Sequence, residues 1–324
     1  MIEPNNNKID IKVDLSKYET SIDDSCPLVS IIIPCYNDGE YILDALESAL
    51  LQSYPSVEVI IVDDASHDSI TISVLNKISH PRVKIYRNDE NLHLSATRNR
   101  GISLSKGKYI LPLDADDKID KYYIQKTVEI MENDSSIGVV YCKANLFGLK
   151  SGLWYFPDFS IDDMLIDNIV FATALFRKDD WIKVGGYSED LKAGLEDYDF
   201  WLSILETGKE IYQIQEVLFY YRIKEKSMTN DMISDLPTKK KTFQYIYSNH
   251  YGLYEKYKEK YLVKLRDVQL EMEFHNRNLE NALAAANETI NQLKKIEQST
   301  FWRITKPARF AMDKLRKLYR IFKK

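Results

Sequence analysis

The sequence has little of three features that define other classes of protein. It holds three cysteines, Cys26, Cys35 and Cys142, without paired metal-ligand spacing, which predicts a reducing compartment and no disulfide framework. No apolar run is long enough to cross a bilayer. The first ten residues, M-I-E-P-N-N-N-K-I-D, have neither a basic region nor an apolar core, so we expect no signal peptide. Together with an ordinary composition, 44% hydrophobic and 29% charged, these absences favour a cytoplasmic globular protein.

Charge is unevenly distributed along the chain, whose 324 residues have a net charge of -5. Residues 294–324 contain eleven basic and two acidic residues, a local charge of +9, which leaves -14 for the rest. This polarity predicts a tail that binds an anionic surface while the body has another role.

Residues 27–235 alternate predicted strands with predicted helices. Buried strands are expected at 29–34, 57–62, 83–87 and 109–113, further strands near Val139 and Leu175, and helices at about 39–52 and 96–104. Such alternation predicts an α/β domain, a mostly parallel mixed sheet with helices on both faces. Residues 1–26 are polar and are expected to form a leader that packs loosely.

Beyond residue 235 the composition changes, because glycine and proline nearly vanish. Residues 236–298 are expected to form a helical extension, with a heptad-like seam from Tyr261 to Ile296. The seam includes His275 and Thr289, so two alternatives stay open. The helix can self-associate into a homo-oligomer, or it can pack on the α/β domain.

The tail, residues 299–324, is predicted to form a basic amphipathic helix. Its aromatic residues, Phe301, Trp302, Phe310 and Phe322, suit a membrane interface better than nucleic acid. We therefore expect an anionic membrane surface as partner, no nucleic acid, and a peripheral position at the cytoplasmic face.

Acidic residues follow two of the predicted strands, as Asp63-Asp64 and as Asp114-Ala115-Asp116-Asp117. A third acidic pair, Glu196-Asp197, comes later in the chain. Acidic turns commonly do no more than cap helices, but the carboxyl ends of strands form the ligand site of open α/β sheets. Carboxylate oxygens suit Mg²⁺ or Mn²⁺, which in turn suit a nucleotide diphosphate.

Six motifs occur in order over residues 28–222. They are V-S-I-I-I-P-C-Y-N, E-V-I-I-V-D-D-A-S, A-T-R-N-R-G, L-D-A-D-D, V-G-G-Y and G-L-E-D-Y-D-F-W-L. In these motifs the chain resembles the family 2 glycosyltransferases, which have a GT-A fold. The resemblance implies an inverting enzyme that moves one sugar from a nucleotide-diphosphate donor, UDP-linked by expectation, to a glycan or lipid-linked acceptor.

The resemblance assigns donor-binding roles to residues in the first half of the domain. Pro34 and Tyr36 are expected in the nucleotide pocket, with the Tyr36 ring against the base, and Asp64 is expected to accept the N3 proton of uracil. Arg98 and Asn99 are expected near phosphate or sugar oxygens. The alternative for Arg98 is a solvated helix residue.

Catalytic and metal-binding roles follow from the same resemblance. Asp114-Ala115-Asp116 matches the family's D-x-D, so Asp116 and Asp114 are expected to bind Mn²⁺ or Mg²⁺ as well as the donor. Asp197 corresponds to the catalytic base, and Glu196 is expected to help shape its pocket. For these two acids the alternative is a helix N-terminus, where carboxylates are favourable, and both roles can hold together.

The chain departs from the family pattern at two positions. His93 occupies the place of a glycine, and Lys224 the place of a histidine that follows the last sheet segment. A charged lysine cannot ligate a metal but can pair with phosphate, so Lys224 is expected to contact the donor. The Gln-x-x-Arg-Trp signature of processive synthases is missing, which favours addition of a single sugar.

Two other functions are alternatives to glycosyl transfer. A sugar-nucleotide nucleotidyltransferase would need a basic residue in its first loop, and P-C-Y-N-D-G-E-Y has none. A catalytically inactive scaffold would act through the C-terminal helix, but the acids of the motifs are intact. Acceptor contacts are expected between residues 143 and 168, foremost Trp154, Tyr155 and Phe156.

Overall fold

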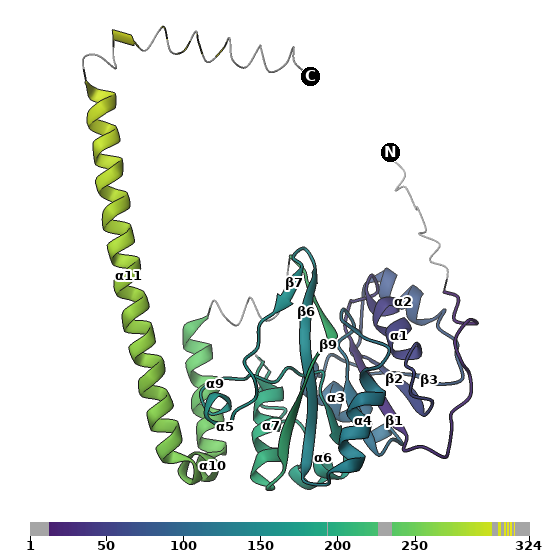
Figure 1. The fold of residues 1–324 in the computed structure, drawn as a ribbon. Coiled ribbons are helices and arrows are strands. Elements are labelled where there is room, and N and C mark those ends of the chain that lie inside the picture. Colours follow the sequence, from purple (N-terminus) through teal and green to yellow (C-terminus); the bar gives the residue numbers. More distant parts are fainter. Residues whose placement is uncertain are drawn as a thin grey trace. The chain divides into compact units, whose positions relative to one another are not determined.

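The computed structural model describes residues 13–192, 194–225 and 235–299, with six single positions beyond them (304, 305, 308, 310, 312 and 314). The chain divides into two compact units, residues 1–261 and 262–324 (Figure 1). Within the described ranges, no helix combines the length and apolar character that crossing a bilayer requires.

The first unit is built on one mixed sheet. In the described part of the chain it has nine strands in the order β3-β2-β1-β4-β8-β6-β9-β5, and β7 pairs with β6. The pairs β1·β2, β1·β4, β2·β3 and β6·β9 are parallel, and the other pairs are antiparallel. The strands are β1 (Val29–Cys35), β2 (Val57–Asp63), β3 (Val83–Arg87), β4 (Tyr109–Pro112), β5 (Lys118–Ile119), β6 (Ile137–Gly148), β7 (Gly152–Trp154), β8 (Leu175–Arg177) and β9 (Glu210–Ile223).

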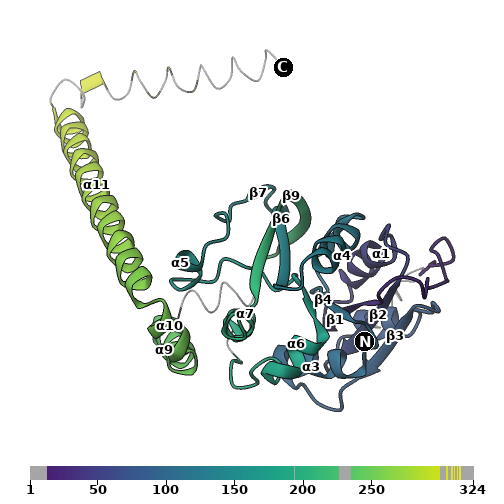
Figure 2. The ribbon, with the colours of Figure 1, turned by 60° about the horizontal axis from the view of Figure 1, so that its bottom comes forward.

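Helices cover both faces of this sheet. Helices α1 and α4 lie on one face, and α3, α6 and α7 lie on the other (Figure 2). The helices are α1 (Ile42–Leu50), α2 (Ser69–Leu75), α3 (His93–Leu104), α4 (Tyr123–Asn133), α5 (Ile161–Met164), α6 (Lys178–Val184), α7 (Glu196–Glu206), α9 (Leu236–Asn249), α10 (Tyr251–Lys256) and α11 (Lys258–Gln298).

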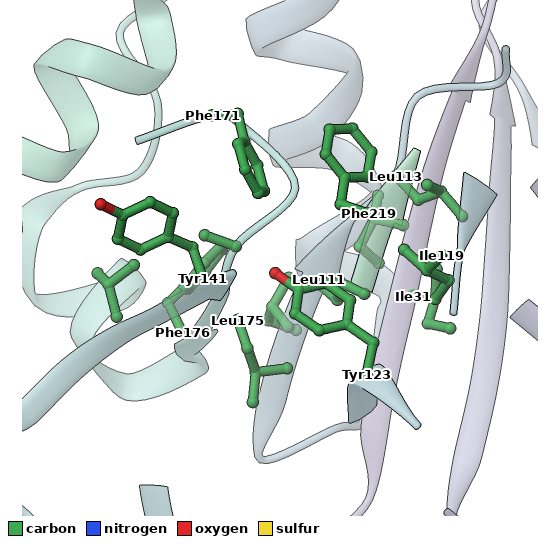
Figure 3. Packing of buried hydrophobic residues seen from close by; sticks show 14 of the residues in the cluster. Ile31, Leu111, Leu113, Ile119, Tyr123, Tyr141, Phe171, Leu175, Phe176 and Phe219 are labelled. Atoms are coloured by element: carbon green, nitrogen blue, oxygen red, sulfur yellow. The ribbon is translucent and has the colours of Figure 1, made fainter. Parts of the chain in front are cut away.

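The central strands are buried on both faces, as a sheet between two helical layers requires. Every residue of β1 and β2 is buried, and their β-branched valines and isoleucines suit such positions. Gly101 lets α3 approach β1 closely, because a Cβ at this position would lie 2.5 Å from Ile32 Cγ2. Figure 3 shows the side chains of Ile31, Leu111 and Phe219 meeting in the core, from three different strands.

The structure confirms the predicted fold class and corrects some of its details. Parallel pairing holds from β3 to β4, but the second half of the sheet is largely antiparallel. Helix α4 and strand β9, the longest strand described, are not among the elements predicted from the sequence. The expectation of a loosely packed leader is wrong for its described part, because Leu15 and Tyr18 are buried.

Helices α9 and α10 belong to the first unit and pack on α7. His250, between α9 and α10, is buried, and its Nε2 lies 3.1 Å from Asp199 Oδ1 in the first turn of α7. Its Nδ1 lies 3.3 Å from Glu206 Oε1 at the other end of that helix. Burial lowers the pKa of His250, but Asp199 and Glu206 outweigh it and raise the pKa above its usual value.

In the second unit, α11 continues as a single helix to Gln298. Most apolar residues of the heptad seam that lie in this unit, among them Leu265, Met272 and Leu279, are exposed, and Val268 is half-buried. The predicted amphipathic helix of residues 299–324 lies almost wholly outside the described residues.

Replacing His250 with Gln is expected to lower the melting temperature, more at about pH 6 than at about pH 9. A histidine with a raised pKa stabilises fully below its unfolded pKa, and this stabilisation is lost as pH rises through the folded pKa. His80 is a matched control, since burial lowers its pKa and predicts the opposite trend for His80→Gln. Thermal unfolding of both variants at both pH values measures the loss of melting temperature. If this loss changes with pH in the same direction for His250→Gln and His80→Gln, the stabilising role of protonated His250 is refuted.

Candidate active site

A cavity of about 950 Å³ lies where β1, β2 and β4 end. Its other walls come from the start of α3, the first turn of α7 and the end of β9. It brings together ten of the eleven predicted site residues: Pro34, Tyr36, Asp64, Arg98, Asp114, Ala115, Asp116, Glu196, Asp197 and Lys224. The expected meeting of distant acids at one pocket is therefore observed.

Four non-glycine residues with positive φ lie at turns beside this cavity. Asn37 (φ 58°) follows β1, Ala65 (φ 60°) follows β2, His93 (φ 67°) begins α3, and Leu195 (φ 65°) precedes α7. Such conformations cost energy and concentrate at functional sites. His93, which replaces a family glycine, keeps the left-handed backbone that glycine adopts readily, so this loop geometry does not require glycine.

Asp64 is held in place by hydrogen bonds to one of its oxygens. Its Oδ1 accepts from Asn88 Nδ2 at 2.6 Å and from the Leu92 backbone N–H at 2.8 Å. Asp63 instead binds its own loop, accepting from the Ser66 N–H at 2.9 Å and pairing with Arg87 at 3.0 Å. Asp64 therefore faces the cavity, whereas Asp63 supports the turn that presents it.

Tyr36 keeps 42% of its surface exposed at the cavity. Its ring makes an edge contact with His67, with centroids 5.8 Å apart. Pro34 lines the same part of the cavity. A partly exposed ring at this position is able to stack on a planar ligand.

Arg98 connects the two acidic groups of the site. The side chain is 1% exposed, with Nη2 2.7 Å from Asp114 Oδ1 and Nη1 2.6 Å from Glu196 Oε1. Burial alone would lower the pKa of Arg98, but the charges of Asp114 and Glu196 have the larger effect and raise the pKa above its usual value. The guanidinium therefore stays charged. The alternative of a solvated helix residue is wrong. Arg98 fixes the D-A-D segment against the start of α7.

Asn99 does not line the cavity, contrary to its predicted role near the nucleotide. Its Oδ1 accepts from the Tyr187 backbone N–H at 2.9 Å and from Trp181 Nε1 at 3.2 Å, and its Nδ2 donates to the Tyr187 carbonyl at 2.9 Å. Gly186 (φ 82°) beside it is required, since a Cβ would lie 2.8 Å from Asn99 Oδ1. The physical reason for the correction is helical geometry, which turns neighbouring side chains to different faces.

The D-A-D-D segment contains carboxylates in different environments. Asp114 pairs with Arg98 and Asp116 with Lys224, while Asp117 is buried and accepts the Arg222 backbone N–H at 2.8 Å. Burial and the charges of Asp116 and Asp114 raise the pKa of Asp117 well above its usual range. Asp117 also borders the cavity, but it is almost fully buried and binds the backbone of β9.

Lys224 lies between two carboxylates at the cavity wall. Its Nζ is 2.6 Å from Asp116 Oδ2 and 3.0 Å from Asp38 Oδ1. The guanidinium of Arg222, two residues earlier, donates to the Asp116 carbonyl at 2.6 Å and pairs with Asp44 at 2.6 Å. These two cations hold the end of β9 against the D-A-D-D segment.

This arrangement of donors does not fit the predicted metal site. Asp114 and Asp116, the expected ligands, already pair with Arg98 and Lys224. Among the described residues, no group of three His, Cys, Asp or Glu side chains is placed to hold an ion. A divalent cation at Asp116 would face an ammonium group that is 2.6 Å from the same carboxylate.

Asp197 begins α7 beside Glu196, facing the cavity. Burial and the charge of Glu196 raise its pKa to about 7, although Arg98, the Tyr198 N–H and Asn168 act in the opposite direction. A carboxylate with a pKa near neutrality can accept a proton at working pH. Asp197 therefore lies both at the start of a helix and at the cavity.

Three functional side chains escaped the sequence analysis. Asp38 partners Lys224, Asn88 holds Asp64, and Asn168 hydrogen-bonds Asp197. The sequence contains a signal for Asp38, because it is an acid in the loop that follows the first strand, where ligand-binding acids are expected. Asn88 and Asn168 had none, because only tertiary contacts bring them to the site.

Comparison with known proteins agrees with this geometry. A family model described as "Glycosyl transferase family 2" matches residues 30–180. A glycosyltransferase of Rickettsia typhi is 33% identical over 65% of this chain and 68% of its own length. The putative teichuronic acid biosynthesis glycosyltransferase TuaG of Bacillus subtilis is 30% identical over 63% of this chain and 82% of its own.

Solved structures share the fold. S. aureus TarS in complex with UDP-GlcNAc aligns with a TM-score of 0.55 at 20% identity, over 64% of this chain and 61% of that chain. The match thus spans less than two thirds of TarS. The chain belongs to glycosyl transferase family 2, and it is a glycosyltransferase.

Replacing Arg98 with Met is expected to lower the free energy of unfolding by about 3–5 kcal/mol, because Asp114 and Glu196 would lose a buried partner. The control is Arg100→Met in the same helix, which removes bonds to the Arg87 carbonyl and to Asn88 Oδ1 but no buried ion pair, and is expected to cost less, about 1–2 kcal/mol. Chemical denaturation measures both. Equal losses would contradict a linking role for Arg98.

Proposed function

We propose that the protein transfers one sugar, with inversion, from a nucleotide-diphosphate donor to an acceptor hydroxyl. The observation that carries this proposal is the single cavity that contains Asp64, the D-A-D segment and Asp197. Family membership supports the reaction class. The complex of TarS with UDP-GlcNAc supports UDP as the carrier, at the level of a shared fold.

In this proposal the donor lies along the carboxyl ends of β1, β2 and β4. The base stacks on Tyr36, next to Pro34, and Asp64 accepts the N3 proton of uracil. Asn88 and the Leu92 N–H, which bind Asp64 Oδ1, fix the carboxylate so that it discriminates between bases. The diphosphate and the sugar then lie near Asp114, Ala115 and Asp116.

The acceptor hydroxyl is activated by Asp197. Its carboxylate takes the hydroxyl proton as the oxygen attacks the anomeric carbon from the face opposite the diphosphate. Arg98 opposes the rise in the pKa of Asp197, while Glu196 and burial drive it. Glu196 itself is fixed by Arg98, so it tunes the base and does not exchange a proton in the reaction.

Family 2 glycosyltransferases commonly use a divalent metal, but the ion pairs of Asp116 and Asp114 do not fit the Mn²⁺ or Mg²⁺ site expected at these residues. No step of the mechanism is assigned to it, because both carboxylates pair with cationic side chains. Lys224 is proposed to contact the donor diphosphate instead.

The acceptor is proposed to enter beside an aromatic group at the far end of the cavity. Trp154 and Phe156 line the cavity there, and Trp154 packs on Tyr221 with centroids 4.4 Å apart. Such rings suit the apolar face of a sugar in a glycan or lipid-linked acceptor. Tyr155, the third predicted contact, is 80% exposed and does not line the cavity.

The C-terminal region is proposed to place this domain near its acceptor. The exposed seam of α11 suits a homo-oligomer, because a second copy would bury the apolar residues that recur along the helix. The basic tail suits the cytoplasmic face of an anionic membrane, where a lipid-linked acceptor would lie.

Transfer is expected to rise with pH through about 7, the pKa of Asp197, because only the ionised carboxylate accepts a proton. Asp197→Asn is expected to abolish transfer and spare UDP binding, whereas Asp190→Asn on the preceding loop should retain both. The assay follows release of UDP from UDP-sugars over a pH series. Release of pyrophosphate, or turnover that survives Asp197→Asn, would overturn the proposal.

Deleting residues 300–324 is expected to move the protein from the membrane to the soluble fraction, since this removes most of the basic tail. Hydrolysis of UDP-sugars should stay intact, because the cavity lies wholly in the first unit. Cell fractionation with a hydrolysis assay measures both. Unchanged fractionation would remove the membrane role of the tail.

A further inference from the structure

The environment of Lys224 differs from that of an ordinary surface lysine. The side chain is 22% exposed and contacts Asp116 and Asp38 from two different loops. Its Nζ also lies 5.1 Å from the centroid of the Tyr41 ring. Three side chains, from two segments of the chain, therefore fix the ammonium group at the cavity wall.

The hydrogen-bonding capacity of this ammonium is not exhausted by its protein partners. A lysine ammonium has three N–H donors, and Asp116 and Asp38 accept two of them. One donor is left for an oxygen atom inside the cavity. The guanidinium of Arg222, in contrast, already binds the Asp116 carbonyl and Asp44.

The position of this charge matters for a diphosphate. Asp116 is the acid at which a donor diphosphate is expected, and a phosphate oxygen beside it needs a cation to offset the like charges. A lysine there provides a point charge and a donor but no lone pair for a metal. Asp38 is a second carboxylate beside the ammonium group, 3.0 Å from Nζ, and it helps to hold the lysine at the cavity wall.

We propose that Lys224 is a built-in cation for the donor diphosphate, so that nucleoside diphosphate binding does not require a divalent metal. The inference rests on the proposed function, because it concerns the same donor pocket. It goes beyond that function by making a divalent metal dispensable for donor binding.

Calorimetric titration of the full-length protein with UDP, in EDTA and in MnCl₂, tests the proposal. Wild type is expected to bind UDP with affinities that differ by about threefold or less between the two conditions. Lys224→Met is expected to weaken binding in EDTA by about tenfold or more, because a charged hydrogen bond is lost. Lys224→Arg keeps the charge and should bind in EDTA.

Lys224→His is the informative exchange, because imidazole can ligate a metal. This variant is expected to bind UDP about tenfold or more tightly with Mn²⁺ than in EDTA. The control is Lys126→Met, which removes an ion pair with Glu216 away from the cavity and should bind UDP as wild type does.

Wild-type binding that disappears in EDTA would overturn the role of Lys224 and leave the proposed function standing. Lys224→Met that binds in EDTA as tightly as wild type would also overturn it. If UDP, ADP and GDP all fail to bind under both conditions, the proposed function itself fails. These outcomes separate the two proposals.

Discussion

The site depends on the double ion pair of Arg98. Its guanidinium is buried and reaches Asp114, at the end of one strand, and Glu196, at the start of α7. Without a shared cation, two groups of carboxylates would not stay together at one cavity, because their like charges repel. The same cation restrains the pKa of Asp197, which burial and Glu196 raise to about 7. Assembly of the site and tuning of its base therefore rest on one side chain.

A second cation organises the other side of the pocket. Lys224 draws Asp38 and Asp116 together, and Arg222 fixes the end of β9 to the same segment. The D-A-D segment thus lies between two cationic groups, Arg98 from α3 and Lys224 from the segment that follows β9. Its carboxylates are oriented by the protein before any donor binds, which reduces the cost of ordering them during binding.

Much of the fold could be predicted from local pattern. The apolar runs at Val29 and Val57 specify buried strands because they satisfy both faces of a covered sheet, and the acids that follow them mark the ligand edge. The antiparallel pairing of β8 could not be predicted, because register depends on distant partners. For the same reason the sequence misplaced Asn99, whose position in a motif says nothing about the direction of its side chain, and missed Asn168.

A double-mutant cycle on the free energy of unfolding, with Arg98→Met and Glu196→Gln, tests the central interaction most directly. If Arg98 joins the two acidic groups, the losses should couple by about 1–3 kcal/mol, because removing the second partner costs little once the first is gone. Losses that add within about 0.5 kcal/mol would show that the two residues act independently, and would contradict the organising role of Arg98.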